Sequence, residues 1–378
     1  MDFLSGLNIW GGGWTGWFVP FVFVLSVIVF FHELGHFLVA RWCGVRVLTF
    51  SIGFGPELIG FNDRHGTRWK FSAIPLGGYV KFFGDENAAS VPDHQAASQM
   101  SEAEKRESFV FKPVGQRAAI VVAGPLANFI LAIVIFAAVF TFYGHQATPA
   151  RVDAVQPGSA AQGAGFQQGD LIVSINGRKM DTFLDMQRFV STAADQELEF
   201  EVERSGKIIK LRATPKLTEQ KDHFGNVHRR GLLGISGLPE PPVPVDPLTA
   251  VKLGAKETWF VVERTLAYLG GVIVGRESAD QLGGPIRIAQ VAGQVATIGF
   301  IPILNLAALL SVSIGLLNLF PVPLLDGGHL LFYAIEALRG RPLSERAQEY
   351  GFRFGLAVVL LLMFFATYND VVQWWMRL

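Results

Sequence analysis

Four long apolar stretches stand out from an otherwise mixed pattern of polar and apolar residues in this 378-residue chain. A helix that crosses a bilayer needs roughly 20 apolar residues. Residues 17–40, 118–143, 297–320 and 354–375 meet that length, although Asp370 interrupts the last stretch near its end. The pattern therefore predicts a polytopic α-helical membrane protein with four transmembrane helices.

Basic residues near the ends of these spans predict their orientation, because Lys and Arg concentrate in cytoplasmic loops. Residues 41–117 contain ten Lys and Arg, and residues 330–353 contain four. Only Asp2 is charged before the first span. Both basic loops are therefore expected in the cytoplasm, with both chain ends and the long segment 144–286 outside.

The outer segment has the pattern of a small mixed domain. Residues 157–177 contain a small-residue helix, a Gly169-Asp170 turn, a β-rich run and an Asn176-Gly177 hairpin turn. This order is similar to a bacterial PDZ domain, a fold that adds a bound peptide to a sheet edge. Residues 230–235 would supply the carboxylate-binding loop. The alternative is a β-rich outer domain without a ligand.

The segment between the outer domain and the third span predicts a linker and an interfacial helix. Residues 239–247 are proline-rich, and residues 248–274 form an amphipathic pattern that includes Trp259. Its charged residues Glu257, Glu263 and Arg264 argue against a fifth span.

The basic loop after the first span contains two apolar, glycine-rich stretches at 50–56 and 69–82 that are typical of a β-hairpin. Non-helical backbone at membrane depth is tolerated only where protein buries it or where it lines a cavity. We therefore expect a re-entrant β-loop beside the active site. A plain cytosolic hairpin is the alternative.

Composition supports a membrane protein: half of the residues are hydrophobic, 17% are charged and the net charge is zero, so nothing indicates nucleic-acid binding. The lone Cys43 excludes an internal disulfide and a cysteine zinc cluster. The first apolar stretch has no basic leader or A-x-A site, which predicts a retained span rather than a signal peptide. No transit-peptide signature is present, which favours a bacterial source.

The candidate chemistry lies in the last third of the first span, at His32-Glu33-Leu34-Gly35-His36. An H-E-x-x-H run puts two imidazoles on one helical face with a carboxylate beside them, the arrangement of a zinc hydrolase. Ionisable groups inside a membrane are costly and mark functional sites. The position of the motif therefore predicts a zinc site within the membrane.

A catalytic zinc site has three protein ligands and one open position. Spans one and three are expected to run in the same direction, so the third ligand should follow span three. Pro321 and Pro323 end that helix, which lets Asp326 approach the histidines; His329 is the competitor. His145 would lie at the opposite membrane face, and His223 and His228 are expected on the surface of the outer domain.

The expected roles follow from the residue types. Glu33 would take a proton from the attacking water and pass it to the leaving amide nitrogen, while zinc would activate the water and polarise the scissile carbonyl. Asn318 would hold an extended substrate backbone or assist the oxyanion. Its alternative role is to cap the broken helix.

The chain as a whole resembles the site-2 protease family of zinc intramembrane metalloproteases, specifically the PDZ-bearing bacterial group of the regulator of sigma-E protease. The resemblance rests on H-E-L-G-H-F-L-V-A-R at 32–41, F-S-I-G-F-G-P at 50–56, I-P-L-G-G-Y-V-K at 74–81, G-P-L-A-N at 124–128, the PDZ segment, G-G-P-I-R-I-A at 283–289 and N-L-F-P-V-P-L-L-D-G-G-H at 318–329. One departure is that a single PDZ domain is present where that regulator has two in tandem.

The resemblance implies zinc-dependent cleavage of transmembrane helices in regulated intramembrane proteolysis, at the bacterial inner membrane. Its substrates would be single-span proteins, such as anti-sigma factors or remnant signal peptides. It implies His32, His36 and Asp326 as zinc ligands and Glu33 as the acid and base. Substrate binding would fall to Asn318, Gly77, Gly78, Tyr79, Val80, Pro321 and Pro323.

The predicted organisation runs as follows: first transmembrane helix 1–41, re-entrant β-loop and amphipathic region 42–117, second transmembrane helix 118–143, extracytoplasmic PDZ domain 144–238, linker and interfacial helix 239–295, third transmembrane helix 296–329, cytoplasmic loop 330–353 and fourth transmembrane helix 354–378. Three rival functions remain: a membrane metallopeptidase acting on cytoplasmic-face peptides, a non-catalytic PDZ membrane scaffold and an ion transporter.

Overall fold

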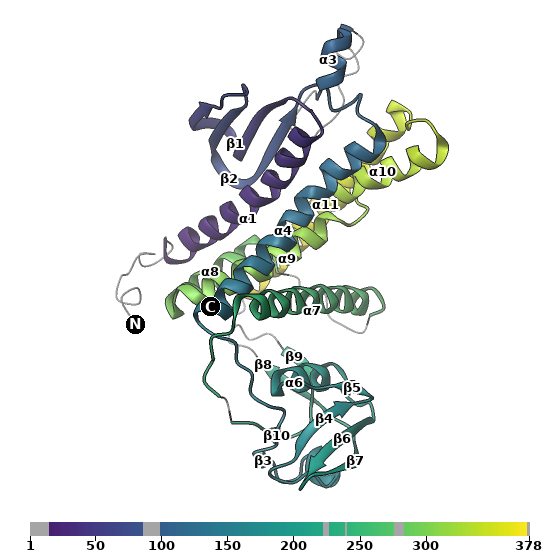
Figure 1. The fold of residues 1–378 in the computed structure, drawn as a ribbon. Helices are drawn as coiled ribbons and strands as arrows, with labels where there is room; N and C mark the ends of the chain where they lie inside the picture. Colours follow the sequence, from purple (N-terminus) through teal and green to yellow (C-terminus); the bar gives the residue numbers. More distant parts are fainter. Residues whose placement is uncertain (1–14, 86–98, 222–226, 239, 276–282, 376–378) are drawn as a thin grey trace. The chain divides into compact units, whose positions relative to one another are not determined.

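The computed structural model describes residues 15–85, 99–221, 227–238, 240–275 and 283–375 (Figure 1). Asp2 and His223, on which two of the expectations rest, lie outside these residues. The chain divides into two compact units. The first unit comprises Met1–Val139 and Pro247–Leu378, and the second comprises Phe140–Asp246.

Four helices of the first unit are long and apolar enough to cross a membrane, as the hydrophobic pattern predicted. The candidate spans are Gly16–Trp42, Val114–Phe142, Phe300–Asn318 and Arg346–Val372. They lie in α1 (Thr15–Trp42), α4 (Val114–Phe142), α9 (Phe300–Asn318) and α11 (Glu345–Trp375). The chain is therefore a membrane protein with four apolar helices.

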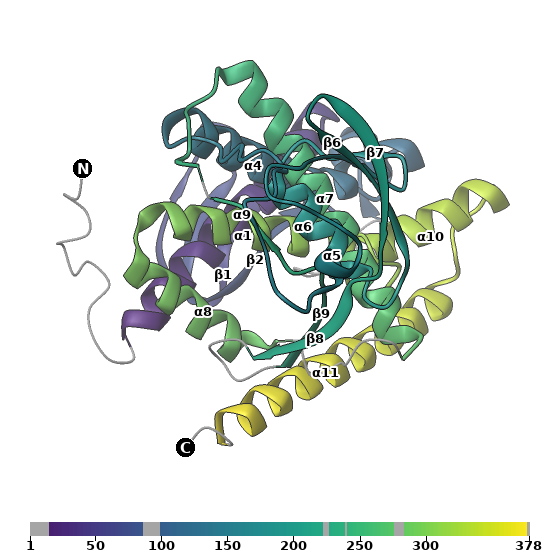
Figure 2. The same cartoon turned by 90° about the horizontal axis from the view of Figure 1, so that it is seen from below.

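A separate helix, α8 (Pro285–Ile298), occupies residues predicted as linker and as the start of the third span. It lies along α1 (Figures 1 and 2) and is separated from α9 by Gly299, whose φ is 145°. The buried Asp370 of α11 accepts hydrogen bonds from the backbone N–H groups of Gly284 (2.9 Å) and Arg287 (3.0 Å) at the start of α8. Asp370, which interrupts the fourth predicted span, therefore caps the N-terminus of α8.

The predicted helix at 248–274 is confirmed as α7 (Pro247–Ile273), which runs crosswise to α4 in Figure 1. Gly254 lets the two helices meet, because a Cβ there would lie 2.9 Å from the carbonyl oxygen of Ile133. Trp259 is 68% exposed on another face. Its location at the membrane interface stays a prediction.

Residues 330–353, predicted as a cytoplasmic loop between two spans, are largely helical rather than irregular, and their cytoplasmic location stays a prediction. Residues 326–339 form α10 (Asp326–Arg339), and α11 begins at Glu345. Leu330 and Tyr333 of α10 pack on a hydrophobic cluster that includes Ile120 and Phe37. The basic residues that marked the segment as cytoplasmic therefore coexist with a packed helix, which ends at Gly340 with a φ of 67°.

The predicted hairpin after the first span is confirmed as β1 (Val47–Asn62) paired with β2 (Arg68–Phe82), and a short α3 (Glu102–Glu107) follows. Near α1, Phe50 and Val80 are buried against Phe37. At the far end, Leu58 and Ile59 are 63% and 75% exposed. Apolar side chains exposed in this way suit a lipid environment, although the re-entrant position stays a prediction.

The second unit is a small α+β domain with its own core. A four-stranded sheet has the order β5-β4-β6-β7, and two further pairs are β10-β3 and β8-β9. The elements are β3 (Ala154–Val155), α5 (Ala160–Gly163), β4 (Leu171–Ile175), β5 (Arg178–Lys179), α6 (Phe183–Thr192), β6 (Leu198–Arg204), β7 (Lys207–Ala213), β8 (Lys216–Lys221), β9 (Val227–Leu232) and β10 (Ile235–Ser236). The predicted Asn176-Gly177 turn is confirmed, with φ values of 49° and 77°.

A buried ion pair stabilises this domain. Asp170 is 1% exposed and receives two hydrogen bonds of 2.7 Å from Arg204. Burial alone would raise the pKa of Asp170, but the bonds from Arg204 and from the backbone N–H of Gln167 hold that pKa below its usual value. The stabilisation is therefore present above the unfolded pKa of about 4 and is lost as the pH falls through the folded pKa.

We expect Arg204→Met to lower the free energy of unfolding of the domain by roughly 2–4 kcal/mol at pH 7, because a buried carboxylate loses its partner. The loss should shrink below about pH 4, where the carboxyl group becomes protonated. Urea denaturation of the 140–246 fragment at several pH values measures both effects. Arg212→Met, at a 68% exposed side chain, is the matched control. Equal stability of the two variants at pH 7 would contradict this account.

Candidate metal centre

The long helix α1 places two imidazoles together near its C-terminal end. His32 and His36 are one helical turn apart, and their Nε2 atoms lie 3.3 Å from each other. His36 is 8% exposed. The H-E-x-x-H spacing therefore produces the shared face that the sequence predicted.

Asp326, the first residue of α10, completes this group. Its Oδ2 lies 3.2 Å from His32 Nε2, and its Oδ1 lies 3.5 Å from His36 Nε2. The three residues form a group able to hold a metal ion, with ligand atoms within 4.8 Å of one another. Asp326, rather than His329, is thus the residue that the structure brings to the two histidines.

These distances fit tetrahedral zinc. Zinc lies about 2.0–2.1 Å from nitrogen and oxygen ligands, which puts neighbouring ligand atoms of a tetrahedron about 3.3 Å apart. The atoms of His32, His36 and Asp326 are separated by 3.2–3.5 Å. Among the described residues, buried Asp326 Oδ2 also has no aligned hydrogen-bond donor, as expected of an oxygen that faces a cation.

The turn between α9 and α10 aims Asp326 at the histidines. Pro321 and Pro323 lie in this turn, where they prevent α9 from continuing. Leu324 has a φ of 90°, a strained value for a residue with a bulky side chain. Gly327 allows α10 to start against the turn, since a Cβ there would lie 2.2 Å from the carbonyl oxygen of Phe320.

Helix α4 supports the histidines from a side that sequence reasoning missed. Ile120 O lies 2.8 Å from His36 Nδ1 and accepts its hydrogen, which leaves Nε2 free to bind a metal. A Cβ on Gly124 would lie 2.2 Å from His36 Nε2, and a Cβ on Gly35 would lie 2.2 Å from Ala123 O. Gly35 and Gly124 could have indicated this contact in the sequence, because small residues let membrane helices approach each other closely.

Glu33 lies between the metal group and the β-hairpin. Its side chain is buried, and the backbone N–H of Val80 donates a hydrogen bond to its carboxylate. A Cβ on Gly78 would lie 2.6 Å from Val29 Cγ1 and 3.0 Å from Glu33 Cγ. Strand β2 therefore lies directly against α1 beside the carboxylate.

The remaining predicted substrate residues lie in two places. Asn318 is the last residue of α9, immediately before the turn that leads to Asp326. Its side-chain amide makes no hydrogen bond with any residue that the structure describes, so its alternative role as a helix cap finds no support there. Gly77 and Tyr79 flank Gly78 in β2, and Gly77 has a φ of 137°.

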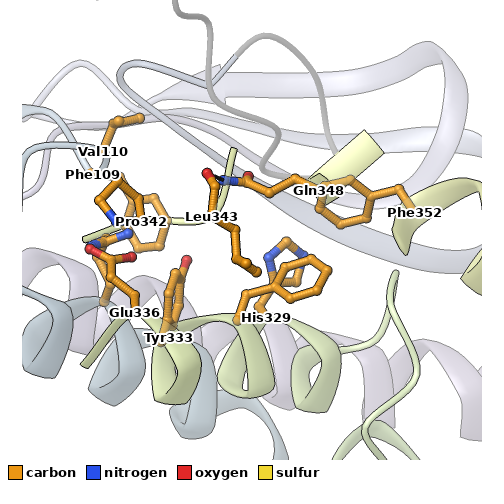
Figure 3. A pocket seen from close by; sticks show the side chains of 11 residues that line it. Phe109, Val110, His329, Tyr333, Glu336, Pro342, Leu343, Gln348 and Phe352 are labelled. Carbon is orange, nitrogen blue, oxygen red and sulfur yellow. Dashed lines mark hydrogen bonds and ion pairs between the residues drawn. The ribbon is translucent and has the colours of Figure 1, made fainter. Parts of the chain in front are cut away.

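His329, the competing third ligand, lines a different cavity of about 150 Å³ (Figure 3). Figure 3 shows His329 beside Phe352 and Tyr333, and the ring centroids of His329 and Phe352 are 5.4 Å apart. His329 is buried, and this burial lowers the pKa of its imidazole. Arg117 and Glu336, which form a 2.6 Å ion pair, also line this cavity.

The other histidines named in the sequence belong to the second unit. His145 forms an isolated β-bridge with Val243, and His228 lies in β9. Neither is in the group of possible metal ligands found among the described residues.

Comparison with known proteins gives matches along nearly the whole chain. The family described as peptidase family M50 matches residues 20–362. A protein of Agrobacterium fabrum, which is named as a zinc metalloprotease, is 53% identical over 94% of this chain and 96% of its own length. The metalloprotease MmpA of Caulobacter vibrioides is 44% identical over 93% of this chain and 94% of its own.

Two further matches are more distant. The regulator of sigma-E protease RseP of Salmonella typhimurium is 34% identical over 93% of this chain and 97% of its own, in an alignment of 450 residues. A solved PDZ domain of the SdrC-like protein from Listeria monocytogenes is 18% identical over 25% of this chain and 90% of its own. Its TM-score of 0.19 is too low to assign the fold of the second unit.

Proposed function

The chain belongs to peptidase family M50 and is a zinc-dependent metalloendopeptidase of a membrane, and on this basis we propose that it cuts peptide bonds within the transmembrane segments of single-span proteins. The observation that carries the proposal is the position of the metal group. His32, His36 and the adjacent Glu33 lie within the candidate span Gly16–Trp42. Polar groups are costly there unless they perform a function.

His32, His36 and Asp326 would hold the zinc ion through His32 Nε2, His36 Nε2 and the Asp326 carboxylate. Their spacing suits a site with three protein ligands and an open fourth position, which is typical of catalytic rather than structural zinc. When bound, zinc acidifies a water molecule and polarises a carbonyl group.

Glu33 is placed to act as the general base and acid. It neighbours His32 in the chain but is not one of the three ligands, so its carboxylate is left to accept a proton from the attacking water. It then returns that proton to the leaving amide nitrogen. The hydrogen bond from Val80 fixes the position of the carboxylate during both transfers.

The edge of β2 would bind the substrate as an added strand. The backbone N–H of Val80 already faces the Glu33 carboxylate, so this part of the strand lies beside the proposed base. A transmembrane helix hides its carbonyls in internal hydrogen bonds, and pairing with a strand edge would replace those bonds while exposing a peptide bond. Gly77, Gly78, Tyr79 and Val80 would pair with the unwound segment.

The turn after α9 would hold the other side of that segment. The Asn318 amide is available to bind an extended backbone or the developing oxyanion. Pro321 and Pro323 keep this part of the chain extended, next to Asp326.

A change at Gly78 tests the contact between β2 and the catalytic base. Gly78→Ala is expected to lower the cleavage rate about 100-fold, because even a shift of about 1 Å at a reacting group has effects of this size. Zinc content should stay at the wild-type level, since Gly78 does not touch the ligands. Gly270→Ala, at a position where a Cβ meets nothing within 4 Å, is the control. Cleavage at the control rate by Gly78→Ala would argue against a role for this contact.

The positive-inside pattern supports an orientation for the protein. The first and third spans would run inward, which puts the metal group towards the cytoplasmic side of a bacterial inner membrane and residues 144–238 outside. That outer segment would act as a single PDZ domain that binds a peptide or a new C-terminus. The similarity to RseP supports regulated proteolysis of anti-sigma factors or signal-peptide remnants as the process in which this chain acts.

The second candidate function is a metallopeptidase that cuts soluble peptides at the cytoplasmic face, and it would use the same zinc residues. A single-span protein with helix-breaking residues, reconstituted with the enzyme in vesicles, distinguishes the two. Cleavage of that span but not of the matching soluble peptide supports the proposed function, and the reverse result supports the alternative.

A further inference from the structure

One fully buried polar side chain near the metal group is not used by the proposed chemistry. Asn128 lies in α4 and is 0% exposed. Its amide nitrogen Nδ2 lies 3.2 Å from His32 Nδ1. In a transmembrane helix without any charged residue between Arg117 and the end of the helix, such a polar group is costly unless it has a partner.

Contacts with α9 fix the position of Asn128. Ser311 of α9, itself fully buried, donates a 2.9 Å hydrogen bond to the backbone carbonyl of Asn128. Gly315 of α9 makes room beside it, because a Cβ there would lie 3.1 Å from Asn128 Cβ. Asn128 is therefore held where α4 crosses α9, with its amide directed at α1.

The chemistry of zinc then decides which amide atom faces His32. Because Nε2 of His32 is the atom 3.2 Å from Asp326 and 3.3 Å from His36 Nε2, Nε2 must offer its lone pair to the metal. The ring hydrogen must then be on Nδ1, which needs an acceptor. The amide oxygen of Asn128 is buried and has no donor among the described residues. A half-turn of the amide brings that oxygen to Nδ1.

We propose that Asn128 is a positioning residue for the metal centre, whose amide oxygen accepts the Nδ1 hydrogen of His32 and so fixes the ring for zinc binding through Nε2. This inference rests on the proposed function, which makes His32 a zinc ligand. With this hydrogen bond, each of the two histidines would donate its Nδ1 hydrogen to an acceptor in α4. Ile120 O accepts from His36 Nδ1, and Asn128 accepts from His32 Nδ1 eight residues further along.

The variant Asn128→Leu keeps the size of the side chain and removes the acceptor. It is expected to weaken zinc binding about 10–100-fold, the usual effect of losing a group that orients a metal ligand. Asn128→Asp keeps an acceptor oxygen and is expected to bind zinc at least as tightly as the wild type. Ser313→Ala, which removes a hydroxyl that bonds the carbonyl of Leu309 within α9 itself, is the matched control and should keep wild-type affinity. Chelator competition on the purified full-length protein measures all four affinities.

The absorption spectrum of the cobalt-substituted protein gives a second readout. Asn128→Leu should change the ligand-field bands, because the His32 ring is no longer held, whereas Asn128→Asp should restore bands like those of the wild type. A purely structural role for Asn128 predicts lower stability in both variants and no change in these bands. Wild-type zinc affinity and wild-type bands in Asn128→Leu would overturn the proposal.

The wild-type protein itself provides a test that does not depend on any variant folding. In the zinc-loaded protein with ¹⁵N-labelled histidine, Nδ1 of His32 should carry hydrogen and Nε2 should be coordinated to the metal. An unprotonated Nδ1 with Nε2 coordinated would overturn the role of Asn128 alone. A His32 ring without any metal coordination would overturn the proposed function as well.

Discussion

Replacing Glu33 by glutamine is expected to lower the rate of peptide-bond cleavage about 1,000-fold or more while zinc stays bound. Glutamine has the shape of glutamate but cannot accept the proton of the attacking water, and acid–base groups of this kind contribute about 10²–10⁴-fold to a rate. The ligand atoms belong to His32, His36 and Asp326, so the change should leave the metal in place. Single-turnover cleavage and zinc content, measured on the same preparation, separate the two effects.

The control for this variant is Glu349→Gln, which makes the same chemical change at an exposed position of α11. It should cleave at the wild-type rate. If Glu33→Gln lost zinc together with activity, Glu33 would have a role in building the site rather than in proton transfer.

Replacing Gly124 by alanine is expected to weaken zinc binding about 100-fold or more and to reduce cleavage accordingly. The added methyl group would lie 2.2 Å from His36 Nε2, far inside van der Waals contact, so the ring must move by about 1 Å to restore an ordinary separation of at least about 3.4 Å. Metal-ligand distances tolerate only about 0.2 Å, and His36 would therefore stop being a ligand.

Gly115→Ala is the matched control, because Gly115 lies in the same helix and a Cβ there meets nothing within 4 Å. Alanine is the better helix former, so this variant should be at least as stable as the wild type and bind zinc normally. Chelator competition compares the three proteins. Equal zinc affinity in both variants would show that α4 does not pack on the metal ligands as described.

The sequence was sufficient to predict the spans and the members of the metal group. Long apolar runs identify membrane helices because the bilayer sets their length, and His32 and His36 share a face because of the helical period. Asp326 could be chosen because the first and third spans were expected to run in the same direction, which would place their polar ends at the same depth in the membrane. These inferences need only local patterns and the order of the spans.

The support of the site was beyond such reasoning. Whether Gly124 and Asn128 face the histidines depends on the rotation of α4 against α1, which no local pattern specifies. The helices α8 and α10 were missed for a related reason. In the sequence, Asp370 indicated the end of a span, and Arg339 indicated a cytoplasmic loop. In the structure, Asp370 caps helix α8, and Arg339 lies in the last turn of the packed helix α10.

The most direct test of the central claim is the position of the cut in a single-span substrate reconstituted in a bilayer with the purified enzyme. Mass spectrometry of the products identifies that position, with Glu33→Gln as the inactive reference. We predict a cut inside the transmembrane segment that requires zinc and is absent with Glu33→Gln. A cut only outside the segment, or an unchanged cut with zinc-loaded Glu33→Gln, would contradict the account.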